Sequence, residues 1–222
     1  MKILAIGAHL DDIELACGGT IAKAIKAGNQ VKVIIMSKSG YTNFDGKQMR
    51  ENYIAVQEGT KALKTLGLKD EDIEILDFPT KDIPYNSEVI ESIDLRMNQF
   101  NPDVIFTHHP FDTHQAHVGV SKSTISAARR KNTVFFFDPI TPSGRSYVAF
   151  KPQMYVDISG TINEKIASLK EHKTEYKKFG EEWITGVTCR SGFRGYEIGT
   201  EYAEAFEVLR CELSFGNKEK LL

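Results

Sequence analysis

The sequence predicts an α/β protein with a Rossmann-like, mostly parallel sheet and helices on both faces. Short apolar runs, typical of buried strands, alternate with longer segments in which apolar residues recur at helical spacing. Glycines such as Gly28 and Gly67 end several of the helical segments. Strands that alternate with helices of this length form βαβ units with right-handed crossovers, which makes neighbouring strands parallel.

The elements follow one another without an internal repeat or a low-complexity linker. Buried strands are expected at residues 2–8, 31–36, 73–76, 103–107 and 134–137. Helices are expected at residues 13–27, 47–66, 88–100 and 118–130. A strand at 153–158, one highly charged helix at 161–178 and an apolar segment at 203–209 complete the chain. We therefore expect one domain over residues 1–222, with a Rossmann-like core over about 1–140 and a C-terminal elaboration over about 141–222.

Length and charge limit the possible functions. A chain of 222 residues with 41% hydrophobic residues suits one domain with its own core. The 28 basic and 30 acidic residues nearly cancel, so no overall field would attract nucleic acid or an anionic membrane. Three cysteines without paired spacing fit a reducing compartment. The first apolar run is too short for a signal peptide and no stretch would span a bilayer, so a cytoplasmic protein is expected.

Two predicted strand ends carry side chains that bind metals. The first strand runs into His9, Asp11 and Asp12, and the fourth is followed by a loop that contains His114 and His117. In parallel sheets, ligands bind beyond the carboxyl ends of the strands. A dinucleotide-binding turn would have glycines at the first of these loops, and two aspartates there would repel a pyrophosphate.

Each loop also has a simpler interpretation. Asp11 and Asp12 could be an N-cap and a first-turn residue of the following helix. His114 and His117 lie on one helical face, but such pairs often cap helices. Together, the loops fit a catalytic metal site of two histidines and one carboxylate, for which Zn²⁺ is the first choice and Fe²⁺ is also suitable. A second carboxylate as base and a second histidine as oxyanion donor would complete the groups needed for amide hydrolysis.

The two loops resemble the signatures of the LmbE-like, or PIG-L, family of zinc-dependent N-acetylglucosamine de-N-acetylases. The first family signature is Ala-His-Pro-Asp-Asp-Glu followed by Gly-Gly-Thr-Ile. This chain reads Ala-His-Leu-Asp-Asp-Ile-Glu at residues 8–14 and Gly-Gly-Thr-Ile at 18–21. The run Asp-Thr-His-Gln-Ala-His at 112–117 stands in place of the second signature. Arg50 and residues 155–159 and 202–206 extend the similarity over nearly the whole chain.

The resemblance implies a role for each residue of the two signatures. The implied metal ligands are His9, Asp12 and His117; the general base is Asp11; and the oxyanion donor is His114. The match of Arg50 to the family indicates a substrate contact, and Asp112 is expected to bind substrate because it lies between the histidines. The implied substrate is a small N-acetylated amino sugar or its conjugate. Assembly as a homotrimer or homohexamer is also implied.

Two positions depart from the family pattern. Leu10 replaces the usual proline, which should relax the loop slightly. Ala116 replaces an aspartate that orients the neighbouring histidine in relatives, although Asp112 could compensate from the other side. Ala116 keeps open a sugar-binding or regulatory protein on a catalytically impaired scaffold. A metal-dependent phosphoesterase is a further alternative, although its usual two-metal site needs more ligands than these loops supply.

Some expectations concern residues outside the signatures. Arg50 should lie on the helix at 47–66, in a solvated ion pair or against the substrate. At least one of His108 and His109 should be structural, and His172 should be a surface residue on the charged helix. Arg190 and Arg194 should belong to a flexible basic loop, whereas Asp112 could instead cap the following helix.

Overall fold

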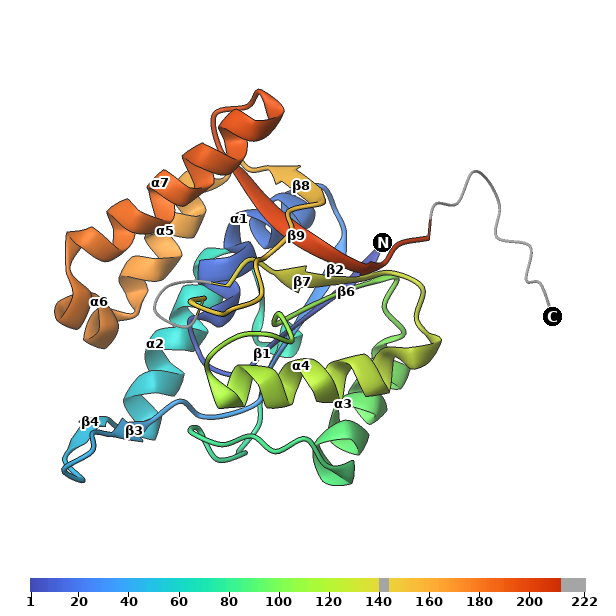
Figure 1. The fold of residues 1–222 in the computed structure, drawn as a ribbon. Helices are drawn as coiled ribbons and strands as arrows, with labels where there is room; N and C mark the ends of the chain where they lie inside the picture. The colour runs from blue at the N-terminus through green and yellow to red at the C-terminus, as the bar shows by residue number, and fades with distance from the viewer. Residues whose placement is uncertain (140–143, 213–222) are drawn as a thin grey trace.

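The computed structural model of the protein describes residues 1–139 and 144–212. Within these ranges the chain forms a sheet with the strand order β5-β2-β1-β6-β7-β9-β8, and a separate hairpin of β3 and β4 (Figure 1). The strands are β1 (Lys2–Gly7), β2 (Gln30–Ile35), β3 (Tyr41–Thr42), β4 (Gln48–Arg50), β5 (Ile73–Ile75), β6 (Val104–Thr107), β7 (Val134–Phe137), β8 (Met154–Asp157) and β9 (Ala203–Arg210). The α-helices are α1 (Asp12–Lys26), α2 (Asn52–Thr65), α3 (Ser87–Phe100), α4 (Gln115–Ala127), α5 (Ile162–Glu171), α6 (Lys173–Phe179) and α7 (Glu181–Ile198).

The strand directions confirm the predicted fold class. β1 pairs in parallel with β2 and β6, β2 with β5, and β6 with β7. Among the described strands of this sheet only β9 runs the other way, because it pairs antiparallel with both β7 and β8. The predicted strands at 153–158 and 203–209 are therefore part of the same sheet as the N-terminal strands.

Alternate residues of β1 supply the two sides of the core. Ile3 and Ala5 join the cluster that contains apolar residues of α1 and α2, whereas Leu4 and Ile6 join the cluster of α3 and α4. Helices therefore cover both faces of the sheet (Figure 1). β1 lies between β2 and β6, so the strand order reverses beside β1. The carboxyl ends of β1 and β6 form the crevice where ligands bind in folds of this kind.

The prediction of a helix at 47–66 was wrong for its N-terminal part. Residues Gln48–Arg50 form β4, which pairs with β3, and α2 begins only at Asn52. The turn of this hairpin is stabilised by the side chain of Asn43, which accepts hydrogen bonds from the backbone N–H groups of Asp45 and Lys47. Arg50 is thus the last residue of a strand rather than a helical residue.

Two expectations for the last third also fail. The single helix predicted at 161–178 is divided into α5 and α6 at His172, whose ψ of 65° is not helical. Its buried side chain is held by contacts with other elements, and these contacts outweigh local helix propensity. Arg190 and Arg194 lie within α7 rather than in a flexible loop.

A kink in α1 explains the Gly-Gly-Thr run. Helical geometry is interrupted at Cys17, and the N–H groups of Gly19 and Thr20 donate to the carboxylate of Glu204 on β9. Lys165 on α5 donates to the carbonyl of Leu15 and pairs with the same carboxylate at 2.5 Å. A Cβ atom at Gly19 would lie 2.7 Å from Ile158, so only glycine allows this close packing.

Among the described residues, no helix combines the length and hydrophobicity needed to cross a lipid bilayer.

Candidate active site

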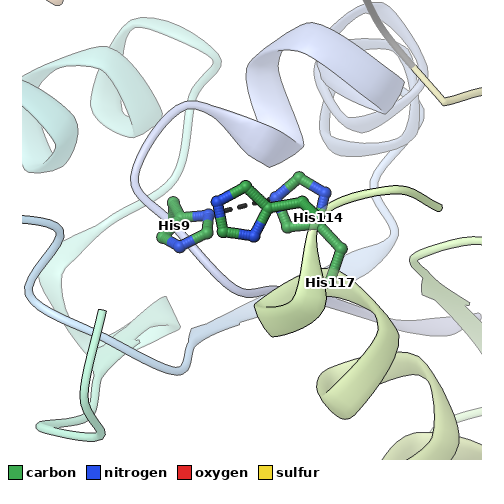
Figure 2. Close-up of side chains that lie close together, drawn as sticks. All are labelled: His9, His114 and His117. Carbon is green, nitrogen blue, oxygen red and sulfur yellow. Dashed lines mark hydrogen bonds between the residues drawn. The ribbon is translucent and has the colours of Figure 1, made fainter. Parts of the chain in front are cut away.

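The two signature loops meet beyond the carboxyl ends of β1 and β6. The Nδ1 atom of His9 lies 3.1 Å from the Nε2 atom of His117 (Figure 2). The carboxylate of Asp12 completes the triangle, with one oxygen 3.7 Å from His9 Nδ1 and the other 3.3 Å from His117 Nε2. The structure thus brings together the three side chains that the resemblance implied as metal ligands.

Outer hydrogen bonds determine which ring nitrogens of this cluster carry lone pairs. The Nε2–H of His9 donates to the carbonyl oxygen of Thr80 at 2.8 Å. The Nδ1–H of His117 donates to the carboxylate of Asp112 at 3.0 Å. In neutral rings, His9 Nδ1 and His117 Nε2 are therefore acceptors. Two imidazole lone pairs and the Asp12 carboxylate face one another, and this donor set fits a divalent cation.

A proton and a metal ion compete for the same position in the cluster. Burial lowers the pKa of His117, but Asp12 and Asp112 outweigh it and raise the pKa to about 10. Burial lowers the pKa of His9 to about 4, so its ring is neutral at physiological pH. Burial raises the pKa of Asp12, yet His117 and His108 hold the net pKa well below its usual range. Two of the three groups are thus already in the form that could bind a metal, and His117 would have to lose a proton.

His108 joins this cluster, although no functional role was predicted for it. Its Nε2 atom lies 3.0 Å from an oxygen of Asp12, and its ring stacks on His117 with centroids 4.0 Å apart. Asp12, His108 and His117 form one possible metal-binding group, which overlaps the predicted one. His109, the next residue, pairs instead with Glu207 on β9 at 3.2 Å. The only feature of the sequence that pointed to His108 was its place in a pair of consecutive histidines directly after β6.

His114 is better suited to donate a hydrogen bond than to bind a metal. Together with His9 and His117 it forms another possible metal-binding group. Its Nδ1 atom accepts a hydrogen bond from the N–H of Ala116 at 3.2 Å, so the neutral ring carries its proton on Nε2. Burial and the neighbouring His117 lower the pKa of His114, which favours this neutral ring. The Nε2–H is then available as a hydrogen-bond donor.

Asp11 occupies the N-cap position of α1 without capping it. Its φ of 142° is rare for an L-residue, and its side chain makes no capping hydrogen bond. Such strain is often found at functional sites. Burial and the adjacent Asp12 raise the pKa of Asp11 to about 8. A carboxylate with a pKa near neutrality is well matched to proton transfer.

Asp112 contacts a histidine and also caps the loop backbone. One oxygen accepts the Nδ1–H of His117, and the other accepts the N–H of His114 at 2.8 Å. Both contacts lie beside the cluster, so Asp112 is placed to orient His117. Ala116 is fully buried in the core between α3 and α4. No carboxylate at position 116 is therefore needed to complete the hydrogen bond at His117 Nδ1.

The loop that carries His9 is anchored by Leu10. This side chain is fully buried, and a Cβ atom at Gly59 of α2 would lie 2.4 Å from it. The expected relaxation of the loop is therefore offset by close packing against α2.

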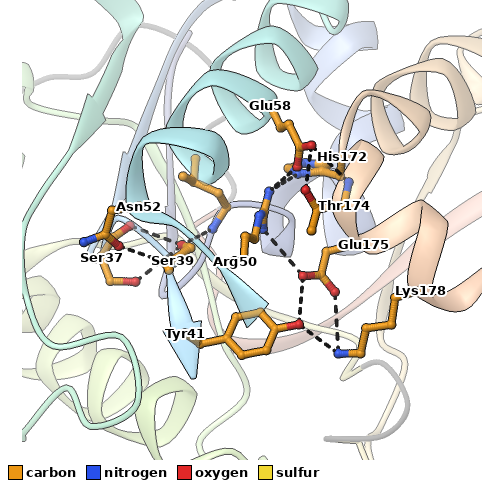
Figure 3. Close-up of polar contacts among 12 residues, drawn as sticks. Ser37, Ser39, Tyr41, Arg50, Asn52, Glu58, His172, Thr174, Glu175 and Lys178 are labelled. Atoms are coloured by element: carbon orange, nitrogen blue, oxygen red, sulfur yellow. Dashed lines mark hydrogen bonds and ion pairs between the residues drawn. The ribbon is translucent and has the colours of Figure 1, made fainter. Parts of the chain in front are cut away.

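Arg50 belongs to a buried polar network beside Asp11 rather than to the solvated surface. Its guanidinium lies 3.0 Å from Glu58, 3.2 Å from His172 Nδ1 and 3.9 Å from Glu175 (Figure 3). The expectation that His172 is a surface residue was wrong, because its side chain is fully buried and its Nε2 lies 2.8 Å from Glu14. A lone histidine in a charged segment gives no sequence signal for such long-range contacts.

The candidate metal cluster and this network face one cavity of about 410 Å³. The cavity is lined by His9, Asp11, Asp12, Arg50, His114 and His117, among others. Tyr41, Lys178 and Trp183 also line it. A volume of this size suits a small ligand.

Comparison with known proteins identifies the family. Residues 4–128, more than half of the chain, match the family described as PIG-L: GlcNAc-PI de-N-acetylase. The chain belongs to the PIG-L family. The uncharacterized deacetylase YaiS of Escherichia coli (strain K12) is 32% identical over 178 residues, which cover 78% of this chain and 90% of that protein. Diacetylchitobiose deacetylase of Thermococcus kodakarensis is 24% identical over 223 residues, covering 94% of this chain and 83% of that protein.

Solved structures of this fold include more than one kind of enzyme. N,N′-diacetylchitobiose deacetylase from Pyrococcus horikoshii matches 94% of this PIG-L chain and 84% of its own, with a TM-score of 0.79 and 21% identity. The 4-carboxy-2-hydroxymuconate hydratase GalB from Pseudomonas putida KT2440 matches 97% and 99%, with a TM-score of 0.71 and 17% identity. At these identities the likeness shows the fold alone, so the reaction must be argued from the site.

Proposed function

We propose that this PIG-L protein is a metal-dependent hydrolase that removes the N-acetyl group from an N-acetylglucosamine-type amino sugar or its conjugate. The observation that carries the proposal is the convergence of three metal-type acceptors, from His9, Asp12 and His117, in the wall of one cavity. The same cavity is also lined by the carboxylate of Asp11, whose backbone is strained, and by the neutral imidazole of His114. Two of the sequence relatives are named deacetylases, which supports the same reaction.

Each polar group at the cluster has a role in this reaction. A divalent ion held by His9, Asp12 and His117, with Zn²⁺ as first choice and Fe²⁺ as second, would polarise the acetyl carbonyl and make a water molecule more acidic. Asp11 accepts a proton from the attacking water. His114 donates its Nε2–H to the carbonyl oxygen as negative charge develops there. The proton held by Asp11 then passes to the leaving nitrogen, so that the C–N bond breaks to give acetate and a free amine.

The remaining residues hold the reacting groups and the sugar. Asp112 fixes the ring of His117 through Nδ1, as carboxylates commonly do for metal-binding histidines. Arg50 lines the cavity and is locked in place by Glu58 and His172, so it is a rigid donor for sugar hydroxyl groups. The wall formed by Tyr41 and Trp183 provides apolar surface for the sugar ring.

Acetate release tests the proposal directly. Protein stripped of metal and protein reloaded with Zn²⁺ or Fe²⁺ would be incubated with N-acetylglucosamine, N,N′-diacetylchitobiose and further N-acetylglucosamine conjugates. Equal amounts of acetate and free amine, formed only by the reloaded protein, would support the deacetylase. Metal binding with no acetate from any conjugate would favour a sugar-binding or regulatory protein instead. Hydrolysis of a phosphoester without acetate release would favour a phosphoesterase.

A further inference from the structure

Two buried serines, Ser37 and Ser39, tie the loop after β1 to the segment after β2. The backbone N–H and the hydroxyl of Ser37 both donate to the carbonyl oxygen of Ala8, at 3.1 Å and 2.8 Å. Ser39 reaches further along the loop, because its Oγ atom accepts the N–H of Leu10 at 2.8 Å. The two hydroxyl oxygens lie 3.4 Å apart (Figure 3). The first signature loop is therefore held by side chains that lie outside both signatures.

Ser39 makes this contact from a strained backbone. Its φ of 63° lies in the left-handed region, which glycine adopts readily and other residues avoid. The next residue, Gly40, donates its N–H to the side-chain oxygen of Asn52 at 2.9 Å, which fixes the segment against α2. Glycine at position 39 would adopt the same backbone without strain, but it could not accept the N–H of Leu10. A residue that keeps its hydroxyl in this conformation points to a function for the hydroxyl.

Two site residues flank the amide that Ser39 holds. His9 has anchors of its own, because its ring Nε2–H donates to the carbonyl of Thr80 at 2.8 Å and its backbone N–H donates to Asp12 at 2.6 Å. Asp11 has a φ of 142°, and its side chain makes no capping hydrogen bond. Its carbonyl oxygen accepts a hydrogen bond from the first turn of α1, which fixes the residue on one side. On the other side, the backbone is held by the hydroxyl of Ser39.

We propose that Ser39 is a positioning residue for the general base: by accepting the N–H of Leu10, its hydroxyl fixes the strained backbone of Asp11 and thereby directs the carboxylate. The proposal rests on the proposed function, in which Asp11 accepts a proton from the attacking water. Ser39 lines the cavity, but its hydroxyl is already engaged by Leu10 and donates to the carbonyl of Ser37 at 3.3 Å. A misplacement of about 1 Å can lower a rate by about 10²-fold, so loss of this hydroxyl should affect kcat rather than KM.

Ser39→Ala and Ser39→Gly both remove the hydroxyl but differ in strain. We expect each to lower kcat for acetate release by about 10–100-fold, with KM and metal affinity within about twofold of the unaltered protein. Ser39→Gly should melt at a higher temperature than Ser39→Ala, because glycine relieves the strain at this φ. An equal loss of kcat at unequal stability separates positioning from maintenance of the fold. The matched control is Asn101→Gly, which makes the same change at a φ of 52° outside the cavity lining and should leave kcat unaltered.

A double-mutant cycle tests whether Ser39 acts through Asp11. In Asp11→Asn protein the base is absent, so the addition of Ser39→Gly should lower the residual kcat by less than about twofold. A larger further loss would place the effect on another group and overturn the proposal. It would also be overturned by a raised KM at unchanged kcat in the Ser39 variants, which would indicate a direct substrate contact.

Hydrogen exchange at the Leu10 amide tests the anchoring without the reaction. In protein with isotopically labelled leucine, NMR should show this amide exchanging about tenfold faster in Ser39→Ala and Ser39→Gly, and at its original rate in Asn101→Gly. An unchanged rate in the Ser39 variants would overturn the proposal whether or not acetate is released. Faster exchange, in a protein that releases no acetate when unaltered, would support the anchoring of the loop and reject the proposed hydrolysis.

Discussion

The Nδ1 atom of His9 faces the Nε2 atom of His117 at 3.1 Å, although 108 positions separate the two residues in the chain. Each ring donates its outer N–H to an oxygen of the protein, so in the neutral form of both rings each would present a lone pair to the other. Facing lone pairs repel unless a proton or a metal ion lies between them. This relationship leads to predictions about the proposed metal ion, about Asp11 as the proposed base, and about the neighbouring residues Asp112 and Ala116.

Removal of the metal should abolish activity and lower stability. A ligand that binds only the folded state stabilises it by about 4 kcal/mol at a thousandfold excess over Kd. We therefore expect a chelator to lower the melting temperature, and Zn²⁺ to restore it. His117→Ala should show no such dependence on metal. An unchanged melting temperature after verified removal of the metal would argue against a site at these residues.

Asp11→Asn should lower kcat by about 10²–10⁴-fold, because the proton acceptor is lost. Asparagine also tolerates positive φ better than most residues, so the strained backbone should be retained. Metal content, measured by mass spectrometry, should remain equal to that of the unaltered protein. If kcat falls by less than about threefold, Asp11 is not the general base.

Asp112→Asn should weaken metal binding by about 10–100-fold, since the amide cannot replace the carboxylate that orients His117. Competition with a fluorescent chelator would measure the affinity. Asp138→Asn, which alters a carboxylate of the same cavity that does not contact His117, is the matched control. Equal metal affinity in both variants would refute the orienting role of Asp112.

Ala116→Asp should not restore any missing function. Position 116 is fully buried, and a carboxylate there must lose its hydration in an apolar core. We expect a lower melting temperature and a kcat within about twofold of the original, since Asp112 already occupies His117 Nδ1. A large rise in turnover would show instead that the scaffold is impaired by Ala116.

The buried pair of His172 and Glu14 should make stability depend on pH. Burial lowers the pKa of His172, but Glu14 outweighs this effect, so the folded-state pKa lies above the usual 6.5. The stabilisation is therefore complete below pH 6.5 and is lost as the pH rises through the folded-state pKa. His172→Asn should cost about 3–5 kcal/mol at low pH and less at high pH, as measured by urea unfolding. Glu14→Gln should remove most of this pH dependence, and a cost that does not change with pH would contradict the charged pair.

Sequence patterns predicted most of the fold because they report local properties. Apolar runs and helical spacing correctly indicated the strands at 134–137 and 203–209 and the helix at 88–100, to within about one residue at each end. The errors occurred where contacts between distant residues override local preference. Gln48–Arg50 pairs as a strand within a hairpin, and the helix at 161–178 breaks so that His172 can reach Glu14.

The sequence by itself determined the α/β class and the two loops that carry the candidate metal ligands, because strand ends and signature residues are encoded locally. Only the tertiary structure decided which partners lie behind those ligands: Asp112 at His117, His108 at Asp12, and the buried contacts of Arg50 with Glu58 and His172. It also decided that Ser39, which follows β2, holds the backbone of Leu10 in the first signature loop. These features depend on sheet register and helix packing, which bring together side chains far apart in the sequence and control their charge through burial.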